Sequence, residues 1–164
     1  MGKIFLHRHG DFSTLLRILG DELQILPALV EKDYWLMHVL YGLKNQGIVF
    51  ELKGGTSLSK GYKIIERFSE DIDIYIHPPA GMEVEEDPKK EKDHQVESRR
   101  IFFDWLAANI RIDGITEVIR DTNFDNSKFT SAGIRLIYPS VTETVEGLKP
   151  GILLEAGFDT VTPN

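Results

Sequence analysis

The sequence contains no cysteine among its 164 residues and no long hydrophobic run. The first absence excludes disulfides, thiolate metal sites and a cysteine nucleophile. The second excludes a membrane span, which needs about 18 or more apolar residues. The N-terminal MGKIFLHRHGDF interrupts its short apolar patch with charge, unlike a signal peptide. With no targeting signal in the sequence, we expect a cytoplasmic protein without a membrane partner.

An excess of positive charge is also missing. Lysine and arginine number 19 against 26 acidic residues, and the formal net charge is -7. This balance argues against broad electrostatic adhesion to nucleic acid, although it allows a local basic groove or a nucleotide that enters with Mg²⁺. Hydrophobic residues make up 41% of the chain, so residues 1–164 are sized for one globular domain with a core of its own.

Apolar spacing divides the chain into helices and strands. Apolar residues recur every three or four positions over 21–47 and form one stripe over 94–109, as in amphipathic helices, and they alternate with polar residues over 71–76, as in a strand. The expected helices cover Asp21 to Gly47, Thr56 to Arg67 and His94 to Asn109, and the expected strands cover Ile48 to Leu52, Asp71 to Ile76, Ile115 to Asp121, Ala132 to Tyr138 and Ile152 to Phe158. Residues 77–93 are rich in proline and charge, which predicts a mobile surface loop that could act as a lid.

The most informative stretch runs from Phe50 to Ile76 and begins with a strand that ends in a glycine turn. Gly54 and Gly55 let the backbone turn tightly, and Thr56 is well placed to cap the following helix. Free N–H groups at such a helix start bind phosphate. Two further candidates for phosphate contact are Ser57 and Lys60. A glycine pair alone is weak evidence, because many such pairs are only turns.

Two acids follow the glycine turn at strand spacing. Residues two apart in a strand project to the same face, so Asp71 and Asp73 point one way while the intervening isoleucines face the core. Carboxylate oxygens suit Mg²⁺ or Mn²⁺, and two such ions would activate an attacking hydroxyl and hold a leaving pyrophosphate. The competing interpretation is a solvated strand face. Combined with the glycine turn, the acid pair favours a nucleotide site.

A third carboxylate usually completes such a site, as a metal ligand or as a base for the incoming hydroxyl. Glu155 is our choice, because a charged residue within an apolar strand is costly without a partner. Asp159, on the same face, and Asp121, at the end of another strand, stay open as alternatives. The competing interpretation is that Glu155 lies on an exposed strand face and has no catalytic role.

Other charged residues are better explained by structure. We expect Glu31 and Lys32 to serve helix packing and ion pairing, and His7 to lie in a solvated N-terminus without nearby carboxylates. Lys53 lies just before the glycine turn, and the sequence does not decide its role. The final residues 161–164 directly follow the last expected strand, so we expect the chain to be part of a longer protein.

Three motifs resemble one protein family. They are Glu31-Lys32-Asp33-Tyr34-Trp35, Lys53-Gly54-Gly55-Thr56-Ser57-Leu58-Ser59-Lys60 and Arg67-Phe68-Ser69-Glu70-Asp71-Ile72-Asp73. The order of glycine turn, helix and Asp-x-Asp strand is similar to that of the nucleotidyltransferase superfamily, and the motifs together resemble its AbiEii/AbiGii branch. The resemblance spans Pro27 to Ile76 and is looser afterwards.

The resemblance implies an α/β (α+β) chain with the minimal nucleotidyltransferase fold, a mixed β-sheet flanked by helices. It implies an NTP substrate and a divalent metal ion, with Gly54, Gly55 and Thr56 as the phosphate turn and Asp71 and Asp73 as metal ligands. Members include toxins of toxin–antitoxin and phage-abortive-infection systems, some of which modify tRNA, so an antitoxin partner is also implied. Members continue into a mostly helical region, which we expect residues 1–164 to lack.

Residues and resemblance together predict a Mg²⁺-dependent nucleotidyltransferase core, with Mn²⁺ as the other candidate metal. It would transfer a nucleotide from an NTP to an acceptor hydroxyl of RNA or protein. Two alternatives stay open. One is γ-phosphoryl transfer, which would use the same turn and metals, and the other is a non-catalytic nucleotide-binding module.

Overall fold

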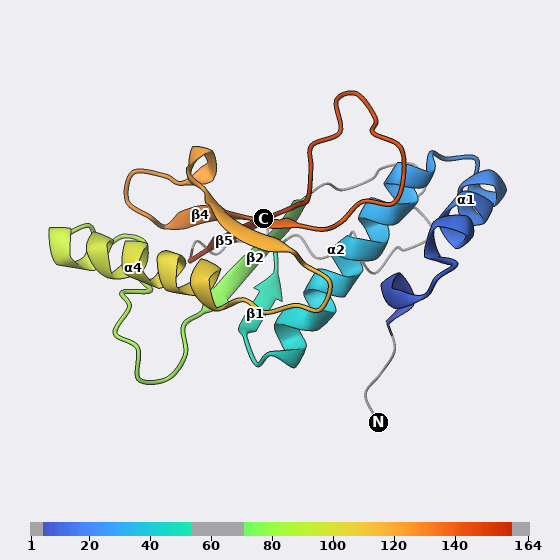
Figure 1. Cartoon of the computed structure of the whole chain (residues 1–164). Helices are drawn as coiled ribbons and strands as arrows, with labels where there is room; N and C mark the ends of the chain where they lie inside the picture. Colours follow the sequence, from blue (N-terminus) through green and yellow to red (C-terminus); the bar gives the residue numbers. More distant parts are fainter. Residues whose placement is uncertain (1–4, 54–70, 159–164) are drawn as a thin grey trace.

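The computed structural model describes residues 5–53 and 71–158 (Figure 1). The elements in chain order are η1 (Leu6–Arg8), α1 (Phe12–Leu23), α2 (Pro27–Asn45), β1 (Val49–Leu52), β2 (Asp71–His77), α4 (Asp93–Asn109), β3 (Glu117–Asp121), η3 (Thr122–Phe124), β4 (Ser131–Ile137) and β5 (Ile152–Gly157). Within these ranges no helix is both long enough and apolar enough to cross a membrane.

The five strands form one mixed sheet in the order β1-β2-β5-β4-β3. The central pair, β2 and β5, is parallel, and every other neighbouring pair is antiparallel. The expected α+β class with a mixed sheet and helices is therefore confirmed. Because β2 and β5 are far apart in the sequence, only the folded sheet brings their side chains together.

One face of the sheet carries the hydrophobic core. Ile72, Ile74 and Ile76 of β2 are at most 2% exposed, and they share a single cluster with side chains of α2 and α4. The two helices therefore cover this face. The period-two pattern predicted for β2 is confirmed, and it turns the intervening acids to the opposite face of the sheet.

The N-terminal region differs from the expected single helix over 21–47. Residues 21–23 instead end α1, where Gln24 adopts a left-handed conformation with φ of 59°, and α2 begins at Pro27. Proline at the first helical position suits a helix start, and it disfavours helical backbone at the residue before it. The apolar period continues across the break, which is why spacing alone did not reveal two helices.

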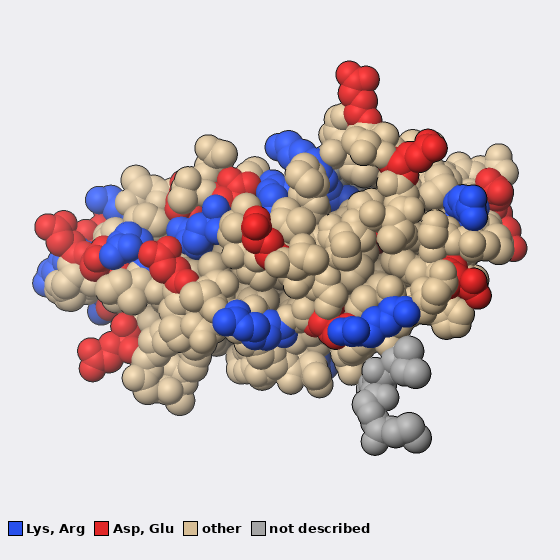
Figure 2. Space-filling view, in the orientation of Figure 1, with Lys and Arg blue, Asp and Glu red and all other residues tan. Residues whose placement is uncertain are grey.

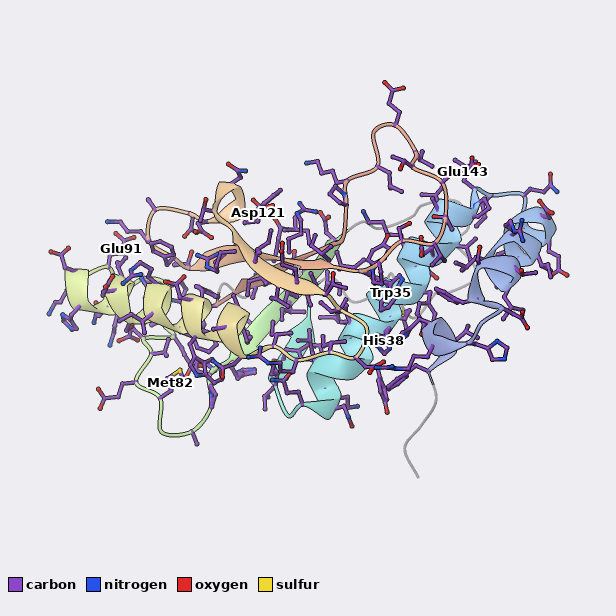
Figure 3. The ribbon with its side chains drawn as sticks, in the orientation of Figure 1. Trp35, His38, Met82, Glu91, Asp121 and Glu143 are labelled. Carbon is purple, nitrogen blue, oxygen red and sulfur yellow. The ribbon has the colours of Figure 1, made fainter. Side chains whose placement is uncertain are left out.

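Residues 78–92 contain no helix or strand, as expected for a loop. The fully buried guanidinium of Arg99 donates hydrogen bonds to the backbone carbonyls of Glu85 (3.2 Å) and Lys90 (2.9 Å). Met82, labelled in Figure 3, packs against the main core. The segment is thus attached to α4, and its mobility stays a prediction.

Candidate functional site

The central strands bring two of the predicted acids together. Asp73 of β2 is the register partner of Glu155 of β5, and Asp71 lies two residues before Asp73 on the same face. Neighbouring strands are about 4.8 Å apart. Although Glu155 is 82 positions after Asp73 in the sequence, the three carboxylates therefore share one area of the sheet, on the face turned away from α2 and α4.

The electrostatics of this area disfavour negative charge. Burial raises the pKa of the Asp73 carboxyl, Lys53 opposes this effect, and the charge of Asp71 adds to it. Burial also raises the pKa of Glu155, and the charges of Asp73 and Asp71 raise it further. Repulsion among carboxylates is relieved when a cation binds between them. The oxygen donors and their mutual repulsion therefore fit a hard divalent ion.

Lys53 is a site residue that sequence reasoning left undecided. Its Nζ lies 3.9 Å from Oδ1 of Asp73, and its side chain is only 12% exposed. Its backbone N–H donates to the carbonyl of Asp73 at 2.9 Å, which extends the pairing of β1 with β2. The register of this pairing fixes the contact, and nothing in the local sequence reveals it.

Asp121 lies on the same row of the sheet but has a different partner. Gly133 of β4 is paired with both Glu155 and Asp121, so Asp121 is two strands away from Glu155. Its Oδ2 accepts hydrogen bonds from Arg135 Nε at 3.2 Å and Nη2 at 3.1 Å. Of the three candidates for the third acid, Glu155 lies beside Asp73, Asp121 is paired with an arginine, and Asp159 lies outside the described residues.

The predicted phosphate turn is also outside the described residues. This applies to Gly54, Gly55, Thr56, Ser57 and Lys60, whose nucleotide-binding roles stay predictions. The described strand β1 ends at Leu52, directly before Lys53 and the glycines. The acids and the start of the turn segment therefore meet at adjacent strands β1 and β2.

The β4–β5 loop, which leads into the strand of Glu155, is fastened to α2. Glu31 is 1% exposed, and its carboxylate accepts hydrogen bonds from Ser140 Oγ (2.7 Å), Val141 N (2.8 Å) and Thr142 Oγ1 (2.7 Å). The neighbouring ammonium of Lys32 donates to the carbonyl of Lys149 at 2.6 Å. The expected packing role of these two residues thus includes holding both ends of this loop.

A second polar cluster connects the N-terminal segment to α2. Across 5–53 and 71–158, His7, His38 and Asp113 are the one group of three possible metal ligands whose ligand atoms lie within 4.8 Å of one another. His7 Nε2 lies 2.7 Å from Asp113 Oδ2, and His38 Nε2 lies 2.8 Å from the Asp113 carbonyl. Tyr34 Oη lies 2.6 Å from the other ring nitrogen of His7.

The contacts of this cluster favour a structural role. Arg8 also binds both carboxylate oxygens of Asp113, and this contact lowers the pKa of Asp113 to about 2. A guanidinium on the carboxylate competes with a metal ion for the same oxygens. The expectation of a solvated His7 without carboxylates was wrong, because its side chain is 5% exposed and paired with Asp113. Their separation by 106 positions hid the pair.

An α+β fold in which an Asp-x-Asp strand pairs with a strand carrying a third acid is typical of nucleotidyltransferases, and such enzymes generally use divalent metal ions. A family model described as the nucleotidyl transferase AbiEii toxin of type IV toxin–antitoxin systems matches residues 38–164, more than half of the chain. The chain belongs to this family, and it is an enzyme of the nucleotidyltransferase class. No curated protein and no solved structure matches the chain.

Proposed function

We propose that this chain is the core of a cytoplasmic, Mg²⁺-dependent nucleotidyltransferase that acts as the toxin of a type IV toxin–antitoxin system. It transfers a nucleotide from an NTP to a hydroxyl of RNA or protein and releases pyrophosphate. The acceptor hydroxyl attacks the α-phosphorus, and the bond from this phosphorus to the bridging oxygen of the pyrophosphate breaks. The proposed partners are the NTP, the acceptor and an antitoxin protein. Mn²⁺ is the alternative metal.

The observation that carries the proposal is the register of β2 and β5. It sets Asp73 beside Glu155 and leaves Asp71 on the same face, within a chain of the AbiEii nucleotidyl transferase toxin family. If these acids were only solvent-facing strand residues, there would be no reason for a third acid to lie beside them on the neighbouring strand. The raised pKa values of Asp73 and Glu155 add support, because they indicate carboxylates that a cation would stabilise.

Each described acid has a proposed role. Asp71 and Asp73 offer oxygen ligands from one strand, and Glu155 offers a third from the adjacent strand or accepts the proton of the attacking hydroxyl. The divalent ion, when bound, supplies Lewis-acid stabilisation of the charge on the triphosphate. The backbone and side chains of Gly54, Gly55, Thr56, Ser57 and Lys60 are proposed to bind the phosphates.

The test uses NTPs labelled at the α-phosphate, each incubated with the protein, Mg²⁺ or Mn²⁺, and total cell RNA and protein. We expect label on an RNA or protein product for at least one NTP. Asp73→Asn and Glu155→Gln should each lose about 10²-fold or more of this transfer. Asp21→Asn changes an exposed acid on α1 in the same way and should retain wild-type transfer.

Parallel reactions with γ-labelled NTPs separate the alternatives. Product labelled from the γ-position, and not from the α-position, would establish phosphoryl transfer in place of nucleotidyl transfer. Nucleotide binding by calorimetry without either label transfer would favour a binding module. Full transfer by folded Asp71→Asn and Asp73→Asn variants would contradict the assigned acids.

A further inference from the structure

The ammonium of Lys53 lies over the sheet, beside the acids and within reach of a ligand bound to them. The distance of 3.9 Å from Nζ to Oδ1 of Asp73 is longer than a direct charge-assisted hydrogen bond of about 2.8 Å. Asp73 itself is 51% exposed on its side chain. Such a pair contributes little to stability, so stability alone gives a weak reason for burying the Lys53 side chain here.

Gly157 of β5 provides the space that Lys53 occupies. A Cβ atom added at Gly157 would lie 2.8 Å from the carbonyl oxygen of Thr130 and 3.0 Å from Nζ of Lys53, so a side chain here would crowd the ammonium. Gly157 is two residues after Glu155 on the same face, and it is paired with Tyr75 of β2. The ammonium therefore reaches from β1 across β2 to β5, and lies one side-chain position along the strands from the pair formed by Asp73 and Glu155.

The charges around Lys53 change when substrate arrives. In the free protein, the ammonium partly offsets the charges of Asp73 and Glu155, and so competes with a metal ion for these carboxylates. Once metal ions neutralise the acids, the ammonium faces the negative triphosphate. A lysine ammonium is a compact point charge on a flexible stem, which suits a phosphate oxygen that arrives with the metal.

We propose that Lys53 is a substrate-binding residue that contacts a non-bridging phosphate oxygen of the metal-bound NTP, and that it serves as the counter-ion of the acids before the NTP binds. This inference rests on the proposed function. It has two consequences of opposite sign. Removing the ammonium should strengthen the binding of a metal ion alone and weaken the binding of the metal–nucleotide complex. A purely structural lysine has no reason to do both.

The test compares the wild-type protein with Lys53→Met in two binding measurements. The first titrates Mn²⁺ alone, followed by electron paramagnetic resonance, and the second titrates α,β-methylene analogues of the four NTPs with Mg²⁺ by calorimetry. We expect Lys53→Met to bind Mn²⁺ about three- to tenfold more tightly and the best analogue about tenfold more weakly.

Two further variants provide controls. Lys53→Arg keeps the positive charge and should recover most of the analogue affinity. Lys44→Met removes an exposed lysine from the last turn of α2, which precedes the opposite end of β1, and should match the wild type in both titrations. Circular dichroism of each variant shows whether it is folded.

The outcomes separate the two proposals. If the wild-type protein binds both ligands and Lys53→Met leaves the analogue affinity unchanged, the role of Lys53 is refuted and the proposed function stands. The role is equally refuted if both affinities fall together, because this indicates a disturbed site. If the wild type binds neither Mn²⁺ nor any analogue, the proposed function fails and the inference fails with it.

Discussion

The carboxylates of Asp73 and Glu155 lie where burial and like charge oppose their ionisation. A carboxyl whose pKa is raised by folding lowers stability at pH values above its unfolded pKa of about 4, because the folded state then holds an unfavourable charge. This penalty disappears as the pH falls through the folded pKa. Asp73 and Glu155 therefore reduce stability at neutral pH, which is a common property of functional residues.

We predict that Asp73→Asn, which should lower transfer activity, leaves the protein equally stable or more stable at pH 7. The expected gain in the free energy of unfolding is at most about 0.5 kcal/mol, because the Asp73 side chain is half exposed and solvent screens its charge. Urea denaturation followed by circular dichroism measures the difference. Asp21→Asn, on α1, serves as the matched control. A loss above about 1 kcal/mol would show that Asp73 has a structural role.

His38 should make stability depend on pH in the opposite direction. Burial lowers its pKa, and the hydrogen bond to the Asp113 carbonyl opposes this shift without cancelling it. The unfolded state therefore binds the proton more strongly, and stability should fall as the pH drops below the unfolded pKa of about 6.5. Both His38 and the adjacent Trp35 belong to α2 (Figure 3).

The test is His38→Gln, which keeps an amide donor near the position of Nε2 and removes the titration. We expect the wild type to lose more stability than the variant in urea denaturation between pH 7.5 and pH 5.5. Groups that titrate in both proteins without interacting with His38 cancel in this comparison, and His7, which does interact with it, is the exception. Equal pH dependence of the two proteins would mean that the burial of His38 does not control its protonation.

At the scale of elements, the beginning of the β4–β5 loop is held to α2 by the side chain of Glu31. The carboxylate of Glu31 accepts three hydrogen bonds from Ser140, Val141 and Thr142. We predict that Glu31→Ala lowers the free energy of unfolding by about 2–4 kcal/mol, because it removes the buried acceptor of three hydrogen bonds, and a hydrogen bond to a charged group contributes about 1.5–3 kcal/mol. Urea denaturation gives the loss, and limited proteolysis should show faster cleavage within residues 138–151.

Glu143 supplies the control for this prediction. It lies exposed on the same loop (Figure 3), so Glu143→Ala should stay within about 0.5 kcal/mol of the wild type. Should the two variants be equally stable, the contacts of Glu31 would be dispensable. The comparison of the two variants thus separates the loss of the loop's contact with α2 from the loss of an acidic side chain as such.

Sequence pattern predicted the elements that have a clear period and missed contacts between distant ones. The alternation of acids with isoleucines predicted that β2 is a strand, and also which of its residues face the core and which face away from it. The break between α1 and α2 before Pro27 was not predicted, because the apolar period continues through it. Glu155 was inferred from the cost of a charge in an apolar strand, whereas the contact of Lys53 with Asp73 depends on strand register. Register is decided by the whole sheet.

At the scale of the whole molecule, charge bears on how a nucleotide approaches. On the face shown in Figure 2, Lys and Arg side chains lie among Asp and Glu side chains and do not gather into one basic surface. The chain carries a net charge of -7. A bare triphosphate would approach an acidic molecule and an acidic site, so we expect nucleotide binding to need the divalent ion.

If nucleotide binding needs the divalent ion, the rise in Tm on binding should require both Mg²⁺ and the NTP. A ligand at 100 times its dissociation constant stabilises the folded state by about 2.7 kcal/mol, which corresponds to a rise in Tm of about 5–10 °C for a chain of this size. We expect such a rise with Mg²⁺ and the preferred NTP together, and a much smaller one with the NTP in EDTA or with Mg²⁺ alone. Differential scanning fluorimetry measures all three conditions.

The matched variant for this prediction is Asp73→Asn, whose own stability should be unchanged or higher. It should lose the additional rise produced by Mg²⁺ and NTP, because the site then has one carboxylate fewer for the metal. A single core cluster joins α2 and α4 to the sheet, so stabilisation at the acids should raise the unfolding temperature of the whole cooperative unit. An NTP-induced rise that is the same in EDTA would contradict a metal-dependent site, and would locate nucleotide binding away from Asp71, Asp73 and Glu155.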